Sequence, residues 1–249
     1  MLPAATSGRR LQSEAGGRDR LRVDVIIPAR DEEESIARAV SSLDPAAVAR
    51  VIVVDNGSRD RTAEVARRAG AMVVSEPRSG YGAACLAGLA YLRSRPPEVV
   101  AFVDADLSDD PAQLPELLTP IREGRADLVI GSRTLGEREA GSLTPVQELG
   151  NRLATAMLGV LFGARFTDLG PFRAIRWDAL ERLRMRDRGY GWTVEMQARA
   201  ARAGLRWAEI PVRHRVRRAG RSKVAGTLRG MLGAGLGIPL TIVRVRLGG

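Results

Sequence analysis

The sequence predicts an α/β protein in which a mainly parallel central sheet is flanked by helices. Short apolar runs rich in β-branched residues recur from Val23 onward, and segments with helical periodicity separate them. This alternation continues for about 110 residues. Because the runs are apolar along their whole length, we expect the sheet to be covered on both faces.

In chain order, five apolar runs are the predicted strands of this region: Val23–Ile27, Val51–Val54, Met72–Val74, Val99–Val103 and Leu128–Ile130. The predicted helices between them carry apolar residues three or four positions apart: Ile36/Val40/Leu43, Val65/Ala66/Ala69, Leu86/Leu89/Tyr91 and Leu114/Leu117/Leu118/Ile121. Parallel sheets of this kind bind ligands beyond the carboxyl ends of their strands.

The second part of the chain is less regular. Residues 134–145 are predicted to form a loop able to move over a site, because they hold glycine, proline, serine and threonine with few apolar anchors. The elements expected after it are a helix from Val146 to Phe162, a short strand ending at Ile175, a helix from Asp178, a helix over Trp192–Ala203, a strand over Trp207–Val212 and an amphipathic helix pair over Gly226–Val245.

These patterns divide the chain into three parts. Residues 1–21 lack hydrophobic periodicity and are expected to form a disordered tail. Residues 22–225 form the expected folded domain, with halves at 22–133 and 134–225. Residues 226–249 are the amphipathic C-terminal segment.

The net charge of +10 is distributed unevenly. Residues 1–150 hold 19 basic and 23 acidic side chains, whereas residues 151–249 hold 20 and 6. The densest basic run is Arg213–Lys223, which contains the only lysine of the chain. Such a run indicates an anionic partner, and the total charge does not choose between a nucleic acid, a membrane surface and a phosphorylated ligand.

Cys85 is the only cysteine and His214 the only histidine. Disulfide scaffolds and zinc sites made of cysteine and histidine are therefore excluded within one chain, and any metal must use oxygen ligands. The longest uncharged stretch, Gly230–Val243, is shorter than the roughly 20 residues of a membrane span and contains Pro239. Without a signal-peptide pattern, the cytoplasm is the expected location.

Asp104-Ala105-Asp106 is the sharpest local feature. It follows the buried run Val99–Val103, at the sheet edge where ligands are expected. Two carboxylates at this place suit one hard cation such as Mg²⁺ or Mn²⁺. Paired aspartates also serve as turn formers and helix caps, so the pair alone does not establish a metal site.

Several motifs in order resemble those of family 2 inverting glycosyltransferases of the GT-A fold, in particular the dolichyl- or polyprenyl-phosphate sugar synthases. The resemblance runs from about Val23 to Thr227. It rests on Val25–Glu33, Val53–Thr62, Asp104–Pro111, Gly131–Arg133, Gly170–Arg173, Trp192–Met196 and Gly220–Val224. This chain has Leu107-Ser108 where many members have glutamine, which leaves the third metal ligand open.

The resemblance implies a role for each matching residue. It makes residues 22–133 the nucleotide and metal half and residues 134–225 the acceptor half. The residues implied to bind the nucleotide are Pro28, Ala29, Arg30, Glu32, Asp55, Gly82, Asp104 and Ala105. Asp104 and Asp106 are implied to hold Mg²⁺ or Mn²⁺ against the diphosphate of a UDP- or GDP-sugar. The residues implied to contact phosphate groups are Arg133, Arg213, Arg221 and Lys223.

The acceptor decides whether a general base is needed. A hydroxyl acceptor requires a base, whereas a phosphate is already an oxyanion and requires mainly positioning. The basic C-terminal part favours a phosphate, with polyprenyl phosphate at the inner membrane face first and a soluble phosphoglycerate second. Asp168 and Glu195 are the candidates for a base or an acceptor-orienting group, and Asp106 and Arg133 complete the expected catalytic set.

Two other functions and one local motif leave alternatives open. A basic nucleic-acid-binding module is disfavoured because only 4% of residues are aromatic and no known DNA-binding motif is present. A nucleotidyltransferase is disfavoured because no glycine-rich loop follows the first strand. Gly80–Cys85 is either a loop near the nucleotide or a tight turn into a helix.

Overall fold

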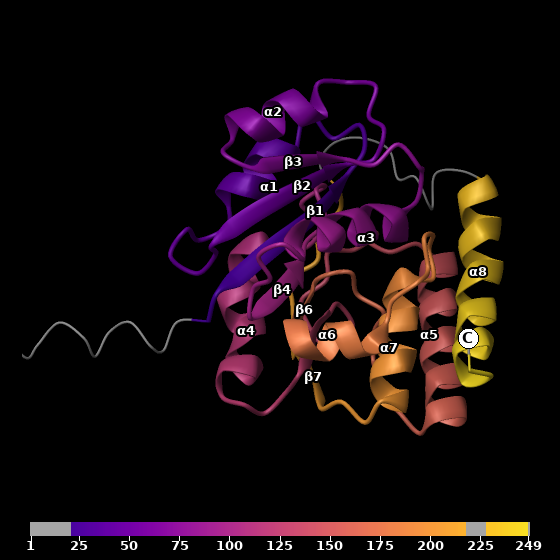
Figure 1. The fold of residues 1–249 in the computed structure, drawn as a ribbon. Coiled ribbons are helices and arrows are strands. Elements are labelled where there is room, and N and C mark those ends of the chain that lie inside the picture. Colours follow the sequence, from indigo (N-terminus) through magenta and orange to yellow (C-terminus); the bar gives the residue numbers. More distant parts are fainter. Residues whose placement is uncertain (1–20, 218–227, 249) are drawn as a thin grey trace, which may run out of the picture.

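The computed structural model describes residues 21–217 and 228–248 and is built around a seven-stranded sheet (Figure 1). The strands are β1 Val23–Ala29, β2 Arg50–Asp55, β3 Met72–Ser75, β4 Val99–Phe102, β5 Leu128–Ser132, β6 Arg173–Arg176 and β7 Trp207–Pro211. Their order across the sheet is β3-β2-β1-β4-β6-β5-β7. The five apolar runs expected as strands all form strands.

The sheet is mainly parallel. β1 pairs in parallel with β2 and β4, β2 with β3, and β5 with β7. β6 lies between β4 and β5 and runs antiparallel to both. The connection from β4 to β5 therefore passes over one strand position, which is later filled from the second half of the chain.

Helices cover both faces of the sheet. They are α1 Ile36–Ser41, α2 Thr62–Arg68, α3 Tyr81–Leu92, α4 Leu114–Arg122, α5 Pro145–Phe162, α6 Trp177–Leu183, α7 Trp192–Arg202 and α8 Leu228–Arg246, with a 3₁₀ turn at Pro111–Gln113. One core packs α1, α2 and α4 against the sheet, and the other packs α3, α6 and α7, with α5 and α8 outside α7 (Figure 1). Alternating residues of β1 show why both faces are covered, since Val25 and Ile27 enter one core and Ile26 the other.

The loop expected over residues 134–145 is irregular in the structure and ends in a well-defined helix start. Thr144 caps α5, because its hydroxyl accepts the amide of Gln147 while the Gln147 side chain accepts the amide of Thr144. Pro145 fits the first helical position, and Gly163 ends the helix with φ +66°. The predicted start at Val146 is thus correct to one residue.

The C-terminal segment differs from its prediction. A helix pair was expected because the segment combines apolar residues with several glycines, but α8 is continuous and includes Pro239. An internal proline removes one backbone hydrogen bond. Packing against α5 and α7, with Ile242 and Val245 buried, compensates for that loss. In Figure 1, α8 lies alongside α5 at one edge of the molecule.

Some expectations fall on parts of the chain that the structure does not describe. These are the N-terminal tail up to residue 20 and the phosphate-contact residues Arg221 and Lys223. The division of the chain into a tail, two halves and a C-terminal segment remains a prediction. No helix within the described ranges is sufficiently long and apolar for a membrane crossing.

Candidate active site

A cavity of about 300 Å³ lies at the carboxyl ends of β1 and β4. The two strands are parallel neighbours, so the residues that follow them meet at one edge of the sheet. The cavity is lined by Pro28, Ala29, Arg30, Glu32, Asn56, Ser79, Gly80, Tyr81, Ala84, Asp104, Ala105, Asp106, Tyr190 and Arg217. Six residues expected at the nucleotide, together with Asp106, are brought together here.

Asp104 is held in this cavity by Tyr81 from the first turn of α3. The Tyr81 hydroxyl donates a hydrogen bond of 3.1 Å to Oδ1 of Asp104. Burial raises the pKa of Asp104 to about 8, and the neighbouring carboxylates Asp106 and Asp109 add to the rise. A cation bound here would favour the ionised form of Asp104, so metal binding and loss of its proton would be coupled.

Asp106 is positioned by an unusual backbone. Leu107 has φ +60°, a left-handed conformation that costs free energy for a residue with a β-carbon. The turn brings the amide of Ser108 within 2.9 Å of Oδ1 of Asp106, and Oδ2 lies 2.6 Å from Nη2 of Arg217. Backbone strain directly after a carboxylate pair is typical of a functional site.

Glu32 faces Asp106 across the cavity. Its Oε2 accepts the Ser35 hydroxyl at 3.0 Å, and its Oε1 accepts Nη1 of Arg217 at 2.9 Å. One guanidinium thus bridges a carboxylate after β1 and a carboxylate after β4. Arg30 projects along the same edge, with Nη1 2.6 Å from the Ser79 hydroxyl.

The Gly80–Cys85 segment is a tight turn into α3. The amides of Gly82 and Ala83 donate to the carbonyls of Gly189 and Arg188, so they are not available to a phosphate. A β-carbon on Gly82 would lie 2.1 Å from the carbonyl oxygen of Asp187. Gly82, expected at the nucleotide, is therefore required for backbone packing, while Gly80 and Tyr81 line the cavity.

Asp55 ends β2 and Asn56 follows it, but only one of the two lines the first cavity. Oδ1 of Asp55 accepts the amide of Ser58 at 3.1 Å, and Asp55 is not part of the lining. Asn56 lines the cavity, and its amide group donates to the carbonyls of Glu76 at 2.9 Å and Arg78 at 2.7 Å. Its Oδ1 accepts the Gly80 amide at 2.9 Å, which fixes the approach to α3.

A second cavity, of about 360 Å³, lies between α5 and α8. Its walls are mainly apolar, and Arg133 provides the only charged side chain of the lining within the described part of the chain. The lining comprises Arg133, Leu143, Thr144, Val146, Gln147, Leu149, Gly150, Asn151, Leu153, Ala154, Leu169, Thr193, Gly235, Ile238 and Pro239. Such a cavity suits a ligand with one anionic end and an apolar body.

Arg133 lines the second cavity and is held there by Asp168. Its Nε and Nη2 donate to Asp168 at 2.8 and 2.7 Å, which leaves Nη1 as the donor without a partner among the described residues. Although burial opposes the charged form, the bonds to Asp168 raise the pKa of Arg133, with further contributions from Asp109 and Asp104 in the metal loop. A permanent positive charge therefore lies within electrostatic range of the first cavity.

Asp168, one of the two candidate bases, is committed to Arg133. It is fully buried, and its Oδ2 also accepts the Arg133 amide at 2.8 Å. Burial acts to raise the pKa of Asp168, but the hydrogen bonds from Arg133 outweigh it and hold the pKa below its usual value. A low pKa makes Asp168 a weak proton acceptor, and its geometry makes it a positioning residue for Arg133.

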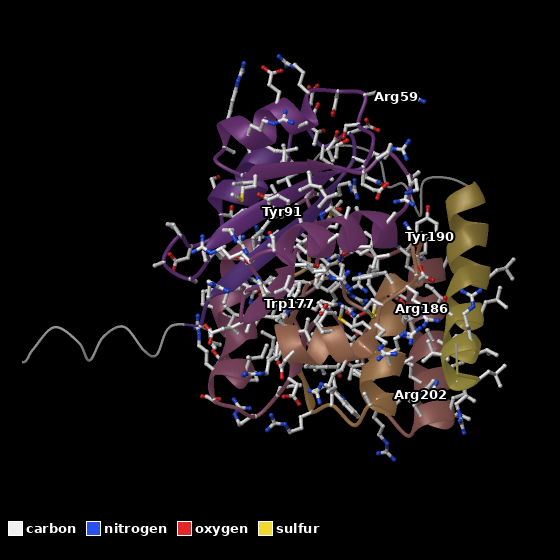
Figure 2. All side chains as sticks on the ribbon, in the orientation of Figure 1. Arg59, Tyr91, Trp177, Arg186, Tyr190 and Arg202 are labelled. Atoms are coloured by element: carbon white, nitrogen blue, oxygen red, sulfur yellow. The ribbon has the colours of Figure 1, made fainter. Side chains whose placement is uncertain are left out.

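Glu195, the other candidate base, is not brought to either cavity. Its carboxylate accepts the backbone amides of Arg186 and Asp187 and pairs with Arg199 at 2.8 Å. These bonds hold the loop before α7, and Tyr190 of that loop lines the first cavity. Figure 2 labels Tyr190 near the end of α3. Glu195 thus supports the cavity wall from behind.

The described residues of the basic run contact the metal loop. Arg213 and Arg215 lie 3.3 and 3.6 Å from Asp110, and neither lines a cavity. Nδ1 of the buried His214 lies 2.7 Å from Asp109. The described part of the basic run is thus attached to the loop that carries the metal carboxylates.

The residues fit a divalent cation that is held partly by its ligand. Within residues 21–217 and 228–248, no group of three or more His, Cys, Asp or Glu side chains forms a complete metal cluster. Mg²⁺ is commonly bound through one or two carboxylates, with substrate phosphates and water completing the shell. Asp104 and Asp106 supply two such carboxylates in one cavity.

Four residues line the first cavity although the sequence did not predict a binding role for any of them: Tyr81, Tyr190, Asn56 and Arg217. Arg217 belongs to the basic run and Tyr81 to the Gly80–Cys85 segment, so both stood in motifs that the sequence made prominent. Tyr190 carried no comparable signal. Its place depends on contacts between α3 and the loop before α7, which are far apart in the chain.

Comparison with known proteins points in one direction. Residues 24–184 match the model of the family described as glycosyl transferase family 2. An uncharacterized glycosyltransferase of Mycobacterium tuberculosis is 41% identical, over 84% of this chain and 93% of that protein. The undecaprenyl-phosphate mannosyltransferase of Micrococcus luteus is 32% identical, over 84% of this chain and 90% of that protein.

Solved structures give the same fold. Glucosyl-3-phosphoglycerate synthase from Mycobacterium tuberculosis, in complex with Mn²⁺, UDP-glucose and phosphoglyceric acid, is 27% identical with a TM-score of 0.73. That match covers 92% of this chain and 80% of the other. The same enzyme has been solved with Mg²⁺ and UDP, at 26% identity and a TM-score of 0.73.

Proposed function

Because the chain belongs to glycosyltransferase family 2, we propose that it moves a sugar from a UDP- or GDP-sugar to a phosphate-bearing acceptor, with polyprenyl phosphate as that acceptor. The observation that carries the proposal is the pair of cavities, since Arg133 lines the second and is within electrostatic range of Asp104 in the first. One cavity offers carboxylates for a metal and the other offers an apolar path ending at a cation.

The first cavity is assigned to the donor. Its volume of about 300 Å³ lies at the lower end of the range of small-molecule sites, and it opens at the strand ends where α/β sheets bind nucleotides. Asp104 and Asp106 would hold Mg²⁺ or Mn²⁺. When bound, that ion stabilises the negative charge that develops on the departing nucleoside diphosphate.

The second cavity is assigned to the acceptor. Nη1 of Arg133 is placed to donate to a phosphate oxygen, and Asp168 fixes the guanidinium in that position. A phosphate oxygen needs no proton removed before it attacks the sugar. This agrees with the structure, in which Asp168 and Glu195 are both engaged in other bonds.

The apolar surface around the second cavity favours a lipid acceptor. Several large apolar side chains of α5 and α8 are exposed: Val146, Leu149, Leu153 and Val160 on α5, and Leu236, Leu240, Val243 and Leu247 on or just after α8. Two helices that expose apolar rows on either side of a cavity suit contact with a bilayer surface. We assign this surface to peripheral membrane contact at the inner face of the membrane.

A soluble phosphorylated acceptor is the second candidate. The specific observation in its favour is the likeness to glucosyl-3-phosphoglycerate synthase, which has been solved with phosphoglyceric acid. Arg133 would bind the phosphate of either acceptor. The apolar walls of the second cavity, however, offer few partners to a small polar acid.

The acceptor is tested by following a radiolabelled sugar from UDP- and GDP-donors, with Mn²⁺, into either a lipid extract or 3-phosphoglycerate. We expect label in the organic phase, and we expect Arg133→Met to remove it because the phosphate loses its donor. Asp178→Asn, which changes an exposed carboxylate on α6, is the matched control and should transfer normally. Label found only in water-soluble product would replace the lipid with the soluble acceptor.

A further inference from the structure

Arg217 lines the donor cavity and pairs there with two of its carboxylates. Its Nη1 lies 2.9 Å from Glu32 and its Nη2 lies 2.6 Å from Asp106. It is also close enough to Asp104 to lower that carboxyl's pKa, against the larger effects that raise it. The side chain is 25% exposed, so the contact is largely shielded from water.

The preceding residues hold Arg217 firmly over the carboxylates. The amide of Arg215 donates to the carbonyl of Ser108 at 2.8 Å, and His214 forms a bridge with Asp109. The amide of Val216 donates to Glu139 at 2.9 Å. The segment before Arg217 is therefore attached to the same loop that carries Asp106.

The ion pair between Arg217 and Asp106 opposes the binding of a metal ion to Asp106. A cation that binds Asp106 must compete with a guanidinium that is already paired there. Separating a shielded ion pair is costly unless each charge finds a new partner. A metal alone offers nothing to Arg217, whereas a diphosphate offers oxygens that suit the guanidinium fork.

We propose that the Arg217 guanidinium pairs with Glu32 and Asp106 until ligands bind, and transfers to the donor diphosphate when metal and donor bind together. Arg217 thereby makes the binding of the metal and the binding of the donor depend on each other. This inference rests on the proposed donor and metal. Arg213 and Arg215 cannot take this role, because their described contacts are with Asp110, which does not line the cavity.

The coupling has a measurable consequence. If the diphosphate raises the affinity for Mn²⁺ by some factor, then Mn²⁺ raises the affinity for the diphosphate by the same factor. Couplings of this kind amount to roughly 5- to 150-fold. Removing the guanidinium should make Mn²⁺ bind more tightly on its own and should reduce that factor.

The test is a titration of free Mn²⁺ by electron paramagnetic resonance, with and without UDP, on the whole protein. We expect Arg217→Gln to bind Mn²⁺ alone about fivefold or more tightly than wild type, and to gain less from UDP. Arg215→Gln is the matched control, since it removes an arginine of the same run that does not line the cavity, and it should behave as wild type. Unchanged Mn²⁺ affinity and unchanged UDP enhancement in Arg217→Gln would overturn the proposal.

A second variant covers a failure of Arg217→Gln to fold. Arg217→Lys keeps the charge but cannot bridge Glu32 and Asp106 with one fork, so it should bind Mn²⁺ alone more tightly than wild type. Equal affinities would overturn the proposal. The wild-type protein separates a failure of this inference from a failure of the proposed function. If wild type binds Mn²⁺ and UDP and the Arg217 variants bind them equally well, only this inference fails. If wild type binds neither under any condition, both fail.

Discussion

At the residue scale, Asp104 and Asp106 flank Ala105 but have different partners. Asp104 is bonded to Tyr81, whereas Asp106 is bonded to the Ser108 amide and to Arg217. Their adjacency and their position after a buried strand could be predicted from the sequence, because both are local features. Their partners could not, since Arg217 is 185 residues away from Glu32, with which it shares the cavity.

Changing one of these carboxylates tests the metal site. Asp106→Asn should reduce sugar transfer about 100-fold or more, because the cation that stabilises the leaving diphosphate loses a charged ligand. Initial rates over a range of Mn²⁺ concentration provide the measurement. Asp110→Asn, in the same loop but outside the lining, is the control, and equal rates in wild type and Asp106→Asn would exclude the assigned role.

The Arg133–Asp168 pair makes a prediction about stability and pH. The lowered pKa of Asp168 means that its contribution to folding is present above the ordinary pKa of aspartate and is lost as the pH falls through the lower value of the folded state. Asp168→Asn should therefore reduce the free energy of unfolding by about 3–5 kcal/mol at neutral pH.

Urea unfolding of wild type and Asp168→Asn at neutral pH and at about pH 3 measures this difference. The two proteins should converge in stability as the solution becomes acidic. Asp178→Asn serves as control, because Asp178 is mostly exposed and its pair with Arg176 spans 3.5 Å. A difference that stays constant over the whole pH range would contradict the assigned ionisation.

At the element scale, the sequence predicted most helices and strands to within a few residues but not the neighbours of β6. Periodicity is local, so it identifies α5 and the strands, whereas the position of β6 between β4 and β5 depends on contacts across the fold. The continuity of α8 was missed for the same reason. Burial of Ile242 and Val245 against other helices decides it, and that burial is not visible in the segment itself.

The exposed apolar rows of α5 and α8 predict binding to membranes. Leu236 and Leu240 are 66% and 61% exposed, so changing both to glutamate should leave the fold intact while weakening contact with a bilayer. We expect the double variant to cosediment with phosphatidylglycerol vesicles much less than wild type. Nucleotide binding should not change, because neither residue lines the donor cavity.

Met72→Glu is the matched control for this surface. Met72 is an exposed apolar side chain on the edge strand β3. Figure 1 shows β3 well apart from α5 and α8. Met72→Glu should cosediment as wild type does. If all three proteins bind vesicles equally, or if none binds, the apolar rows do not form a membrane surface.

In the whole molecule, basic residues of the second half of the chain pair with acidic residues of the first half. The basic second half supplies Arg213, Arg215 and Arg217, and these meet Asp106 and Asp110 of the acidic first half. The two halves thus meet at the proposed metal site. Of the described arginines of the basic run, Arg217 lines the donor cavity, and Arg213 and Arg215 pair with Asp110 of the metal loop.

Donor binding should stabilise this arrangement as a whole. A ligand that binds only the folded state raises the apparent melting temperature. We expect one of UDP or GDP, together with Mn²⁺, to raise it by several degrees, and we expect the nucleotide without metal to have less effect. A panel of nucleotides with and without Mn²⁺ measures both effects, and equal responses to all nucleotides would exclude recognition of the base.

The central claim is transfer of a sugar to a lipid phosphate, and direct competition between acceptors tests it most closely. Purified protein would receive a radiolabelled nucleotide sugar, Mn²⁺, and equal amounts of polyprenyl phosphate in vesicles and 3-phosphoglycerate in solution. We expect label mainly in the organic phase, loss of that label in Arg133→Met and in Asp106→Asn, and full transfer in Asp178→Asn. Label that remains in the aqueous product, or no transfer from any donor, would contradict this claim.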